Sequence, residues 1–228
     1  MISILMPIYN GIEYIDDSVL SVLSQTYHQW ELIIGINGHP ENSDVYQIAK
    51  KYMSFTQQIQ VYDFYKIKGK SNTLNEMLKY ANYSHIAILD VDDIWYPSKL
   101  ETQVKYINDY DVVGSLCVYF GEKTSLNGIV PSLPTENISD FDFCSVNPII
   151  NSSAIIRKEC CYWNSEYDGV EDYDLWLNLR KHGKRFYNCA DVYVKHRIHP
   201  FSAFNTKNNS QMAIQLLKKY RNANASSL

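Results

Sequence analysis

The 228-residue sequence has no long apolar run and no excess of positive charge. A membrane-spanning helix needs roughly 18 or more consecutive apolar residues, and no stretch approaches that length. The formal net charge is −4, which argues against a non-specific nucleic-acid binder or a protein drawn to anionic membranes. Residues 1–10 are apolar but too short for a signal peptide, and they lack a basic start. We therefore expect a cytoplasmic protein without a membrane span.

Cysteine patterns typical of metal sites and disulfides are also absent. The chain has five cysteines, an odd number; two of them are adjacent, and no C-x-x-C pair occurs. This is a poor set for a structural zinc site or a disulfide framework. It favours reduced thiols in a cytosolic protein.

Three motifs for phosphate chemistry are incomplete. A P-loop needs a glycine five residues before Gly69, and Phe64 stands there. A phosphatase with an aspartyl nucleophile needs Thr or Val at the fifth position of its D-x-D motif, where this chain has Ile94. A nucleotidyltransferase would carry a loop rich in glycine and basic residues near the N-terminus, and residues 7–13 are rich in neither. These three classes are therefore disfavoured.

Apolar runs of strand length alternate with segments of helical periodicity, which predicts an α/β fold with a mostly parallel sheet. A capping-box pattern at Ser98–Glu101 predicts a further helix start. Residues 121–145 are irregular and predict a long loop. The predicted strands are 2–8, 30–36, 59–65, 85–89, 111–120, 149–156 and 192–196, and the other predicted helices are 14–25, 45–53, 71–80, 172–182 and 211–220.

Three carboxylates follow a predicted buried strand in the stretch A-I-L-D-V-D-D-I-W, residues 87–95. Two such charges about 5 Å apart repel by roughly 3 kcal/mol at an effective dielectric of about 20, so a compensating interaction is expected. Asp90 and Asp92 point to the same side of an extended chain, at the strand end where open α/β sheets bind ligands. This arrangement suits Mg²⁺ or Mn²⁺. The alternative is a solvated turn in which Asp93 caps a short helix.

Five stretches, taken together and in order, resemble the inverting family 2 glycosyltransferases. They are P-I-Y-N-G-I-E-Y-I-D-D-S-V-L-S-V-L-S-Q-T-Y (7–27), G-K-S-N-T-L-N (69–75), L-D-V-D-D-I-W (89–95), V-E-D-Y-D-L-W-L (170–177) and R-I-H-P-F-S (197–202). The resemblance extends from residue 2 to about residue 202. It implies a three-layer α/β/α sandwich of the glycosyltransferase A (GT-A) type, with a mixed, mostly parallel central sheet.

The resemblance also implies an activity. We expect one domain over residues 1–228, with a nucleotide-binding part at about 1–115, an acceptor-side part at about 116–205 and a helical tail at about 206–228. It would move a single hexosyl or N-acetylhexosaminyl group, with inversion, from a nucleoside-diphosphate sugar. UDP is the expected carrier, and the acceptor is a hydroxyl of a glycan, a lipid-linked sugar or a protein. The alternative is a non-catalytic sugar-nucleotide-binding or scaffold module of the same fold.

Roles for individual residues follow from the matched motifs. The resemblance implies that Asp92, Asp90 and His199 hold Mn²⁺ or Mg²⁺, and that Asp172 is the base that deprotonates the acceptor. It implies contacts with the nucleotide sugar from Pro7, Tyr9, Asn37, Lys70, Asn75, Asp90 and Trp95. Asn37 departs from the family, which usually carries an Asp there to accept the imide N–H of uracil. An amide can accept that hydrogen bond but can also donate one, so dTDP, GDP and CDP remain open as carriers.

Several of these roles have plain structural alternatives. Asp172 could simply favour the positive start of a helix, and His199 could contact the diphosphate instead of a metal. Trp95 could pack in the core instead of stacking on a sugar. The basic residues of the predicted C-terminal helix, Lys218, Lys219 and Arg221, could face a membrane, a partner chain or solvent alone. Peripheral membrane contact and the oligomeric state are therefore left open.

Overall fold

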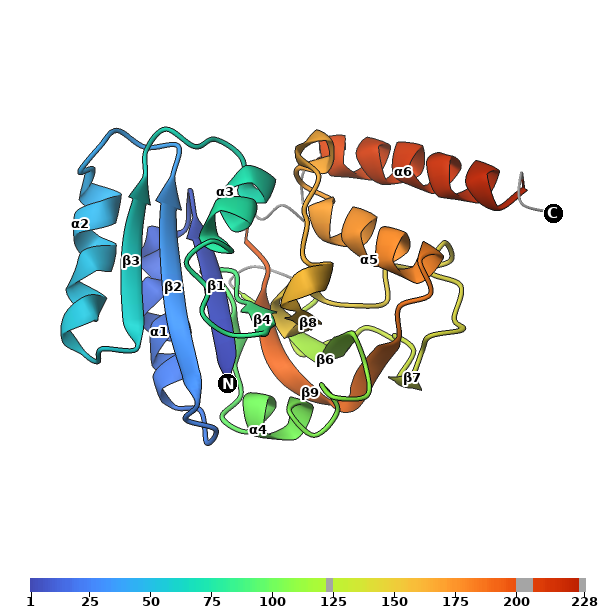
Figure 1. Cartoon of the computed structure of the whole chain (residues 1–228), viewed down its shortest axis with the longest axis horizontal. Helices are drawn as coiled ribbons and strands as arrows, with labels where there is room; N and C mark the ends of the chain where they lie inside the picture. The colour runs from blue at the N-terminus through green and yellow to red at the C-terminus, as the bar shows by residue number, and fades with distance from the viewer. Residues whose placement is uncertain (122–124, 200–206, 226–228) are drawn as a thin grey trace.

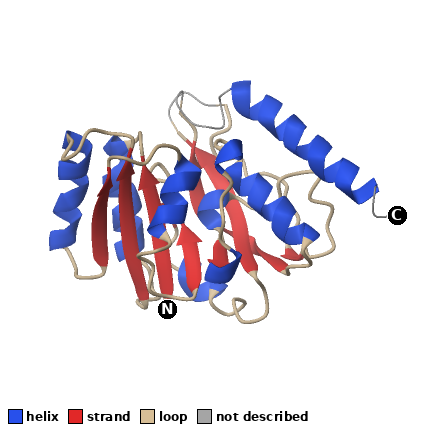
Figure 2. Cartoon of the chain, turned by 45° about the horizontal axis from the view of Figure 1, so that its top comes forward, coloured by secondary structure: helices blue, strands red, loops and turns tan. Residues whose placement is uncertain are grey.

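Strands and helices alternate along the chain and assemble into a nine-stranded sheet with helices on both faces (Figures 1 and 2). The computed structural model describes residues 1–121, 125–199 and 207–225. The strands are β1 (Ile2–Ile8), β2 (Trp30–Asn37), β3 (Ile59–Phe64), β4 (His85–Ile88), β5 (Ile94–Trp95), β6 (Val112–Phe120), β7 (Glu136–Asn137), β8 (Ile155–Arg157) and β9 (Phe186–Arg197). The α-helices are α1 (Ile15–Leu23), α2 (Asp44–Lys50), α3 (Lys70–Met77), α4 (Lys99–Gln103), α5 (Glu171–Lys181) and α6 (Lys207–Ala225).

The sheet has the order β3-β2-β1-β4-β8-β6-β9-β5, and β7 pairs with β9. Strands β3, β2, β1 and β4 run parallel to one another, and β6 runs parallel to β9. The short strand β8 lies antiparallel between β4 and β6. The predicted α/β fold with a mixed, mostly parallel sheet is therefore confirmed.

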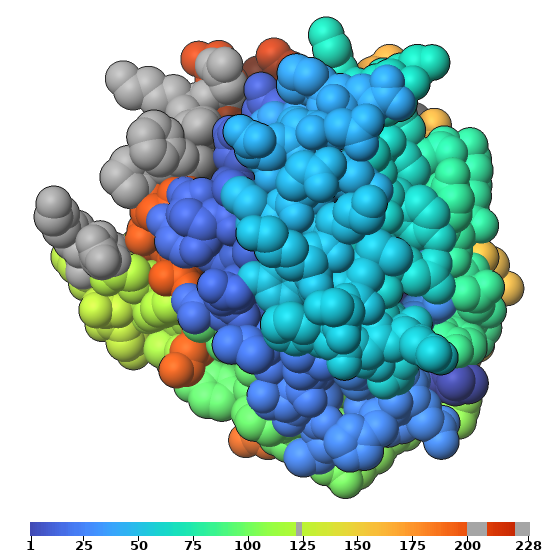
Figure 3. Space-filling view, turned by 90° about the vertical axis from the view of Figure 1, so that its left-hand side faces the viewer, coloured from blue at the N-terminus to red at the C-terminus, as the bar shows by residue number. Residues whose placement is uncertain are grey.

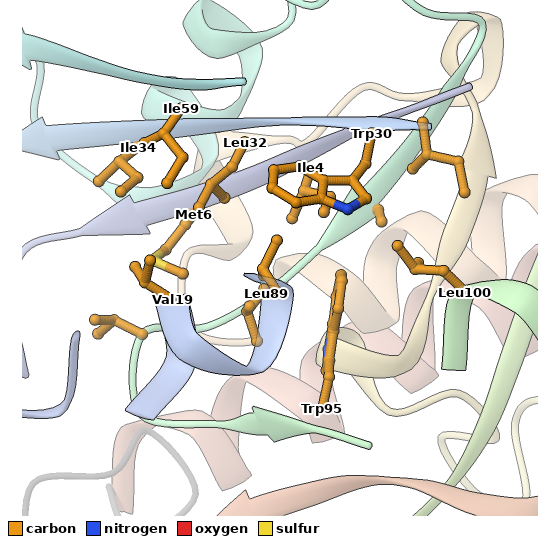
Figure 4. Close-up of a cluster of buried hydrophobic side chains, with 14 of the residues drawn as sticks. Ile4, Met6, Val19, Trp30, Leu32, Ile34, Ile59, Leu89, Trp95 and Leu100 are labelled. Atoms are coloured by element: carbon orange, nitrogen blue, oxygen red, sulfur yellow. The ribbon is translucent and has the colours of Figure 1, made fainter. Parts of the chain in front are cut away.

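Two apolar cores, one on each face of the sheet, hold the layers together. In β1, Ile4 and Met6 face the core shared with α1, α2 and α4, whereas Leu5 faces the core shared with α3 and α5. This is the alternation expected for a strand covered on both sides. Figure 4 shows the first core. Strand residues such as Ile4 and Leu32 lie on one side of the cluster, and Trp95 lies on the other side. Figure 3 views the molecule from the β3 edge, where α2 and β3 form the surface.

Most predicted elements are confirmed, but the strand expected at residues 149–156 forms only at its end. There the chain forms a 3₁₀ turn at Asn151–Ser153, and only the short β8 follows. The Ser152 hydroxyl accepts the Asp90 N–H at 3.1 Å, and the Ser153 hydroxyl accepts the Ser115 N–H at 3.0 Å. Side-chain oxygens therefore take the place of backbone partners, and the apolar run turns instead of extending.

The structure also differs from three smaller predictions. The helix start predicted at Ser98 is confirmed by α4, but the capping box is wrong, because the Ser98 side chain makes no cap hydrogen bond and Glu101 instead accepts from the Thr26 hydroxyl at 2.7 Å. The last strand, β9, is longer than predicted, and so is the C-terminal helix α6.

Within the described ranges, no helix has the length and apolar character to cross a bilayer.

The turn before α3 depends on a glycine. Gly69 has a φ of 88°, a backbone conformation that side chains disfavour. The Asp168 carboxylate accepts the Ser71 N–H at 2.8 Å and so caps the start of α3. A Cβ atom on Gly69 would collide with that carboxylate. Gly69 therefore lets the start of α3 approach the segment before α5.

We expect Gly69→Ala to lower the free energy of unfolding by about 3 kcal/mol, because backbone strain and the collision add. Gly183→Ala is the control for a positive φ without a collision: Gly183 has a φ of 70° and open space around its Cβ position, whereas Gly69 combines its φ of 88° with a ψ of 146°. The cost of Gly183→Ala should be the backbone strain alone, about 1 kcal/mol. Urea unfolding of both variants measures the difference. Equal costs would mean that the contact with Asp168 does not constrain this turn.

Candidate active site

A pocket of about 560 Å³ opens at the carboxyl ends of β1, β2 and β4, the edge where parallel sheets bind ligands. The end of β9 and the turn before α3 complete its wall. The fold thus brings together segments that are far apart in the sequence. The predicted site residues that line the pocket are Pro7, Tyr9, Asn37, Lys70, Asp90, Asp92 and His199.

Lys70 joins two acidic segments at this pocket. Its Nζ lies 2.6 Å from Asp90 Oδ1 and 3.2 Å from Glu171 Oε1. Burial opposes the charge on Lys70, but Asp90 and Glu171 outweigh it and hold the pKa of the ammonium well above its usual range. Burial likewise opposes the charge on Asp90, and Lys70 outweighs it to lower the pKa of that carboxyl. The Asn151 amide donates to the other Asp90 oxygen at 3.1 Å.

Asp92 and His199 meet on the pocket wall. His199 Nε2 lies 3.0 Å from Asp92 Oδ2, and the centroid of the His199 ring is 5.3 Å from that of Tyr14. Burial, followed by repulsion from Asp93 and Asp90, raises the pKa of Asp92 to about 6. A cation beside Asp92 would relieve this repulsion, so this pair has the chemistry of a metal-binding pair.

Asp93 is fully buried and ties β9 to the acidic turn. One of its oxygens lies 3.0 Å from His196 Nδ1, and the other accepts the Arg197 N–H at 2.9 Å. Burial disfavours the charged imidazole of His196, but Asp93 outweighs it and raises the pKa of His196 to about 9. Asp93 is therefore satisfied by protein groups.

Asp172 lies in the first turn of α5, next to Glu171. The Asn147 amide donates to Asp172 Oδ2 at 3.3 Å. Burial and then the charge of Glu171 raise the pKa of Asp172 to about 6, while Lys70 and Asn147 oppose the rise. The carboxylate does not itself line the pocket, but Lys70 connects the pocket to this turn.

Two predicted donor-binding residues lie elsewhere. Trp95 is 2% exposed, and its Nε1–H donates to the Ser152 carbonyl at 2.7 Å. The Asn75 amide donates to the Trp163 carbonyl at 2.7 Å and accepts the Trp163 N–H at 3.0 Å. We correct the expectation for both: Trp95 packs in the core, and Asn75 holds a neighbouring backbone segment.

Two of the three expected metal ligands, Asp92 and His199, meet at the pocket, and the third has other partners. In the part of the chain that the structure describes, no three His, Cys, Asp or Glu side chains are grouped around one metal position. Asp90 turns toward Lys70 and Asn151, which leaves Asp92 with His199. The second half of the R-I-H-P-F-S motif, residues 200–202, lies outside the described residues.

The sequence did not reveal the amides and the acid that orient these groups. Asn147, Asn151 and Asp168 each contact a site segment from 25 to 97 residues away along the chain. A single polar residue in a loop has no periodicity or motif that would mark it in one sequence.

Comparisons with known proteins identify the family. Residues 3–162 match the sequence family described as "Glycosyl transferase family 2". The O-antigen biosynthesis glycosyltransferase WbnJ of Escherichia coli is 31% identical over 219 residues, which cover 87% of this chain and 80% of WbnJ. The E. coli UDP-Glc:alpha-D-GlcNAc-diphosphoundecaprenol beta-1,3-glucosyltransferase WfgD is 29% identical over 213 residues, covering 91% of this chain and 81% of WfgD.

The fold agrees as well. The crystal structure of S. aureus TarS 1–349 in complex with UDP-GlcNAc aligns with a TM-score of 0.72 at 17% identity, covering 96% of this chain and 66% of that chain. This likeness bears on the fold, while the sequence match bears on the family. Since the family match spans most of the chain, the protein belongs to glycosyl transferase family 2 and is a glycosyltransferase with the GT-A fold.

Proposed function

We propose that the protein transfers a single hexosyl or N-acetylhexosaminyl group from a nucleoside-diphosphate sugar to an acceptor hydroxyl, with inversion at the anomeric carbon. The observation that carries this proposal is the position of Lys70, which contacts Asp90 in the pocket and Glu171 beside Asp172. A donor in the pocket would then lie next to a carboxylate able to act as a base. Donor binding is assigned to about residues 1–115 and acceptor binding to about 116–205, followed by the tail at about 206–228.

The pocket suits a nucleotide sugar in size and chemistry. Its volume of about 560 Å³ lies in the usual range for small-molecule sites. Tyr9 and Asn37 lie at the ends of β1 and β2 and would contact the nucleobase of the donor. The Asn37 residue is 3% exposed. UDP is the favoured carrier, because WfgD is named for UDP-Glc and TarS was solved with UDP-GlcNAc.

Asp92 and His199 fit a divalent cation such as Mn²⁺ or Mg²⁺. Two protein ligands suffice for such a cation when the diphosphate of a substrate supplies further oxygens. The raised pKa of Asp92 supports this assignment, because a cation offsets the repulsion among the acids. When bound, the cation would stabilise the charge on the departing diphosphate as a Lewis acid. Asp90 holds Lys70 in the pocket instead of serving as a third ligand.

Asp172 is the proposed base. It would accept the proton of the acceptor hydroxyl as that oxygen attacks the anomeric carbon, on the side opposite the departing diphosphate. A positioned base contributes roughly 10²- to 10⁴-fold to the rate. Asn147 orients the carboxylate, and Lys70 offsets part of the charge of Glu171.

A lipid-linked sugar is the favoured acceptor among a glycan, a lipid-linked sugar and a protein. The relative WfgD is named for transfer to a sugar on diphosphoundecaprenol, a membrane lipid. Peripheral contact with a membrane would follow from such a substrate.

We expect release of the nucleoside diphosphate from one donor in a panel of UDP-, dTDP-, GDP- and CDP-sugars, with Mn²⁺ or Mg²⁺ and not with EDTA. Asp92→Ala should lower this slow hydrolysis on the order of 100-fold, because it removes a metal ligand and its charge. Asp109→Ala changes an exposed carboxylate and is the matched control. Metal-independent hydrolysis, or full activity of Asp92→Ala, would contradict the metal assignment.

The pH profile tests the base. Burial raises the pKa of Asp172 from 3.8 to about 6, so its basic form is lost as the pH falls through about 6. We expect the hydrolysis rate to fall about tenfold per pH unit below that value, and Asp172→Asn to lose at least about 100-fold. Asp92 has a similar pKa, but its protonation competes with metal binding. An acid limb that shifts with Mn²⁺ concentration would therefore belong to Asp92, and a limb independent of Mn²⁺ to Asp172.

A further inference from the structure

Helix α6 packs beside α5 with one face buried (Figures 1 and 2). Leu216 is fully buried and Tyr220 is 6% exposed, whereas Ile214 on the other face is 55% exposed. The helix lies beyond residues 3–162, the span matched by the family.

The first contact joins α6 to the turn that carries Asp172. The Tyr220 hydroxyl donates to Asp174 Oδ1 at 3.2 Å, and Lys219 Nζ lies 3.7 Å from the same oxygen. Asp174 is 6% exposed and lies two residues after Asp172 in the first turn of α5. This buried carboxylate accepts one hydrogen bond from α6 and lies near one ammonium group of the same helix, which ties the turn to α6.

The second contact joins α6 to the segment that holds the Asp172 side chain. An Arg221 guanidinium nitrogen donates to the Cys144 carbonyl at 2.9 Å. Three residues further on, Asn147 donates to Asp172 Oδ2. The neighbouring Phe143 carbonyl accepts the Tyr173 hydroxyl at 2.6 Å, which links the same segment to α5.

The third contact is steric. Gly169 lies just before α5, and a Cβ atom there would collide with the side-chain amide of Asn209 in the first part of α6. The Gly169 N–H donates to Glu171 Oε2 at 2.7 Å. The start of α6 thus packs against the loop that precedes Glu171 and Asp172.

We infer that α6 is a positioning element for the catalytic base. Tyr220 holds the first turn of α5 and Arg221 holds the 143–147 segment, and together they keep the Asn147 amide within hydrogen-bonding distance of the Asp172 carboxylate. This inference rests on the proposed function, in which Asp172 is the base. Among the described residues, none from α6 lines the donor pocket, so we expect the effect on the chemical step and not on nucleotide binding.

The test compares Arg221→Met with Lys218→Met, which changes an exposed basic residue on the same helix. Tyr220→Phe is the second test variant, because it keeps the ring and removes the hydroxyl. UDP release from UDP-glucose and UDP-N-acetylglucosamine with Mn²⁺ gives the rate, and calorimetry gives the Kd for UDP. We expect both test variants to lose on the order of tenfold in kcat while the UDP Kd stays within about twofold. Arg221→Lys, which keeps a donor, should recover most of the loss.

The pH profile separates positioning from general destabilisation. Loss of the Asn147 hydrogen bond would move the acid limb of Arg221→Met to higher pH, because that bond favours the charged form of Asp172. Glu171 raises and Lys70 lowers the pKa of the same carboxyl, and both remain in the variant. An unchanged kcat and an unchanged acid limb in both test variants would overturn the inference.

Two further measurements keep this outcome distinct from failure of the proposed function. Asp172→Asn in the same assay tests the base directly, and full activity of that variant would reject the base whatever α6 does. Hydrogen exchange reports on positioning without any turnover. We expect faster exchange at residues 143–147 and 168–174 in Arg221→Met, with β1 to β4 unchanged. Unchanged exchange at those residues would overturn the inference even if the wild type released no UDP.

Discussion

The ion pairs of Lys70 are the interaction on which the arrangement of the site depends. The Lys70 side chain is one-third exposed, whereas that of Glu171 is only 5% exposed, so the charge on Glu171 needs a cation at close range. Lys70 supplies that charge and binds Asp90 at the same time. One ammonium group thereby connects the end of β4 with the start of α5, which lie about 80 residues apart in the sequence.

The acidic turn at residues 90–93 illustrates how the chain tolerates three neighbouring carboxylates. Two of them have a compensating partner: Asp90 pairs with Lys70, and Asp93 pairs with His196 and the Arg197 N–H. Among the described residues, the Asp92 carboxylate pairs with His199, and its pKa stays raised at about 6. The uncompensated repulsion is therefore concentrated on the residue at the pocket wall, where a cation would relieve it most.

Hydrophobic periodicity was sufficient to predict the sheet and most helices, because buried strands and amphipathic helices leave local patterns. It failed at residues 149–156, where the hydroxyls of Ser152 and Ser153 replace ladder partners. The motifs located the pocket residues, since seven predicted residues line it. They did not separate Trp95 and Asn75 from the site, because whether a side chain faces a cavity or the core depends on packing between distant segments.

The antiparallel strand β8 gives the sheet a seam. It pairs with β4 through three residues and with β6 through two, whereas β1 pairs with β2 through seven and β6 with β9 through nine. The β6–β8 pairing is thus one of the shortest in the sheet, beside β5–β9 with two residues and β1–β4 with three. Because so few ladder hydrogen bonds join β8 to β6, side-chain contacts between the two parallel blocks matter more to their relative placement. Lys70 and Asp168 provide two such contacts at the mouth of the pocket, where they link α3 to the segment at the start of α5.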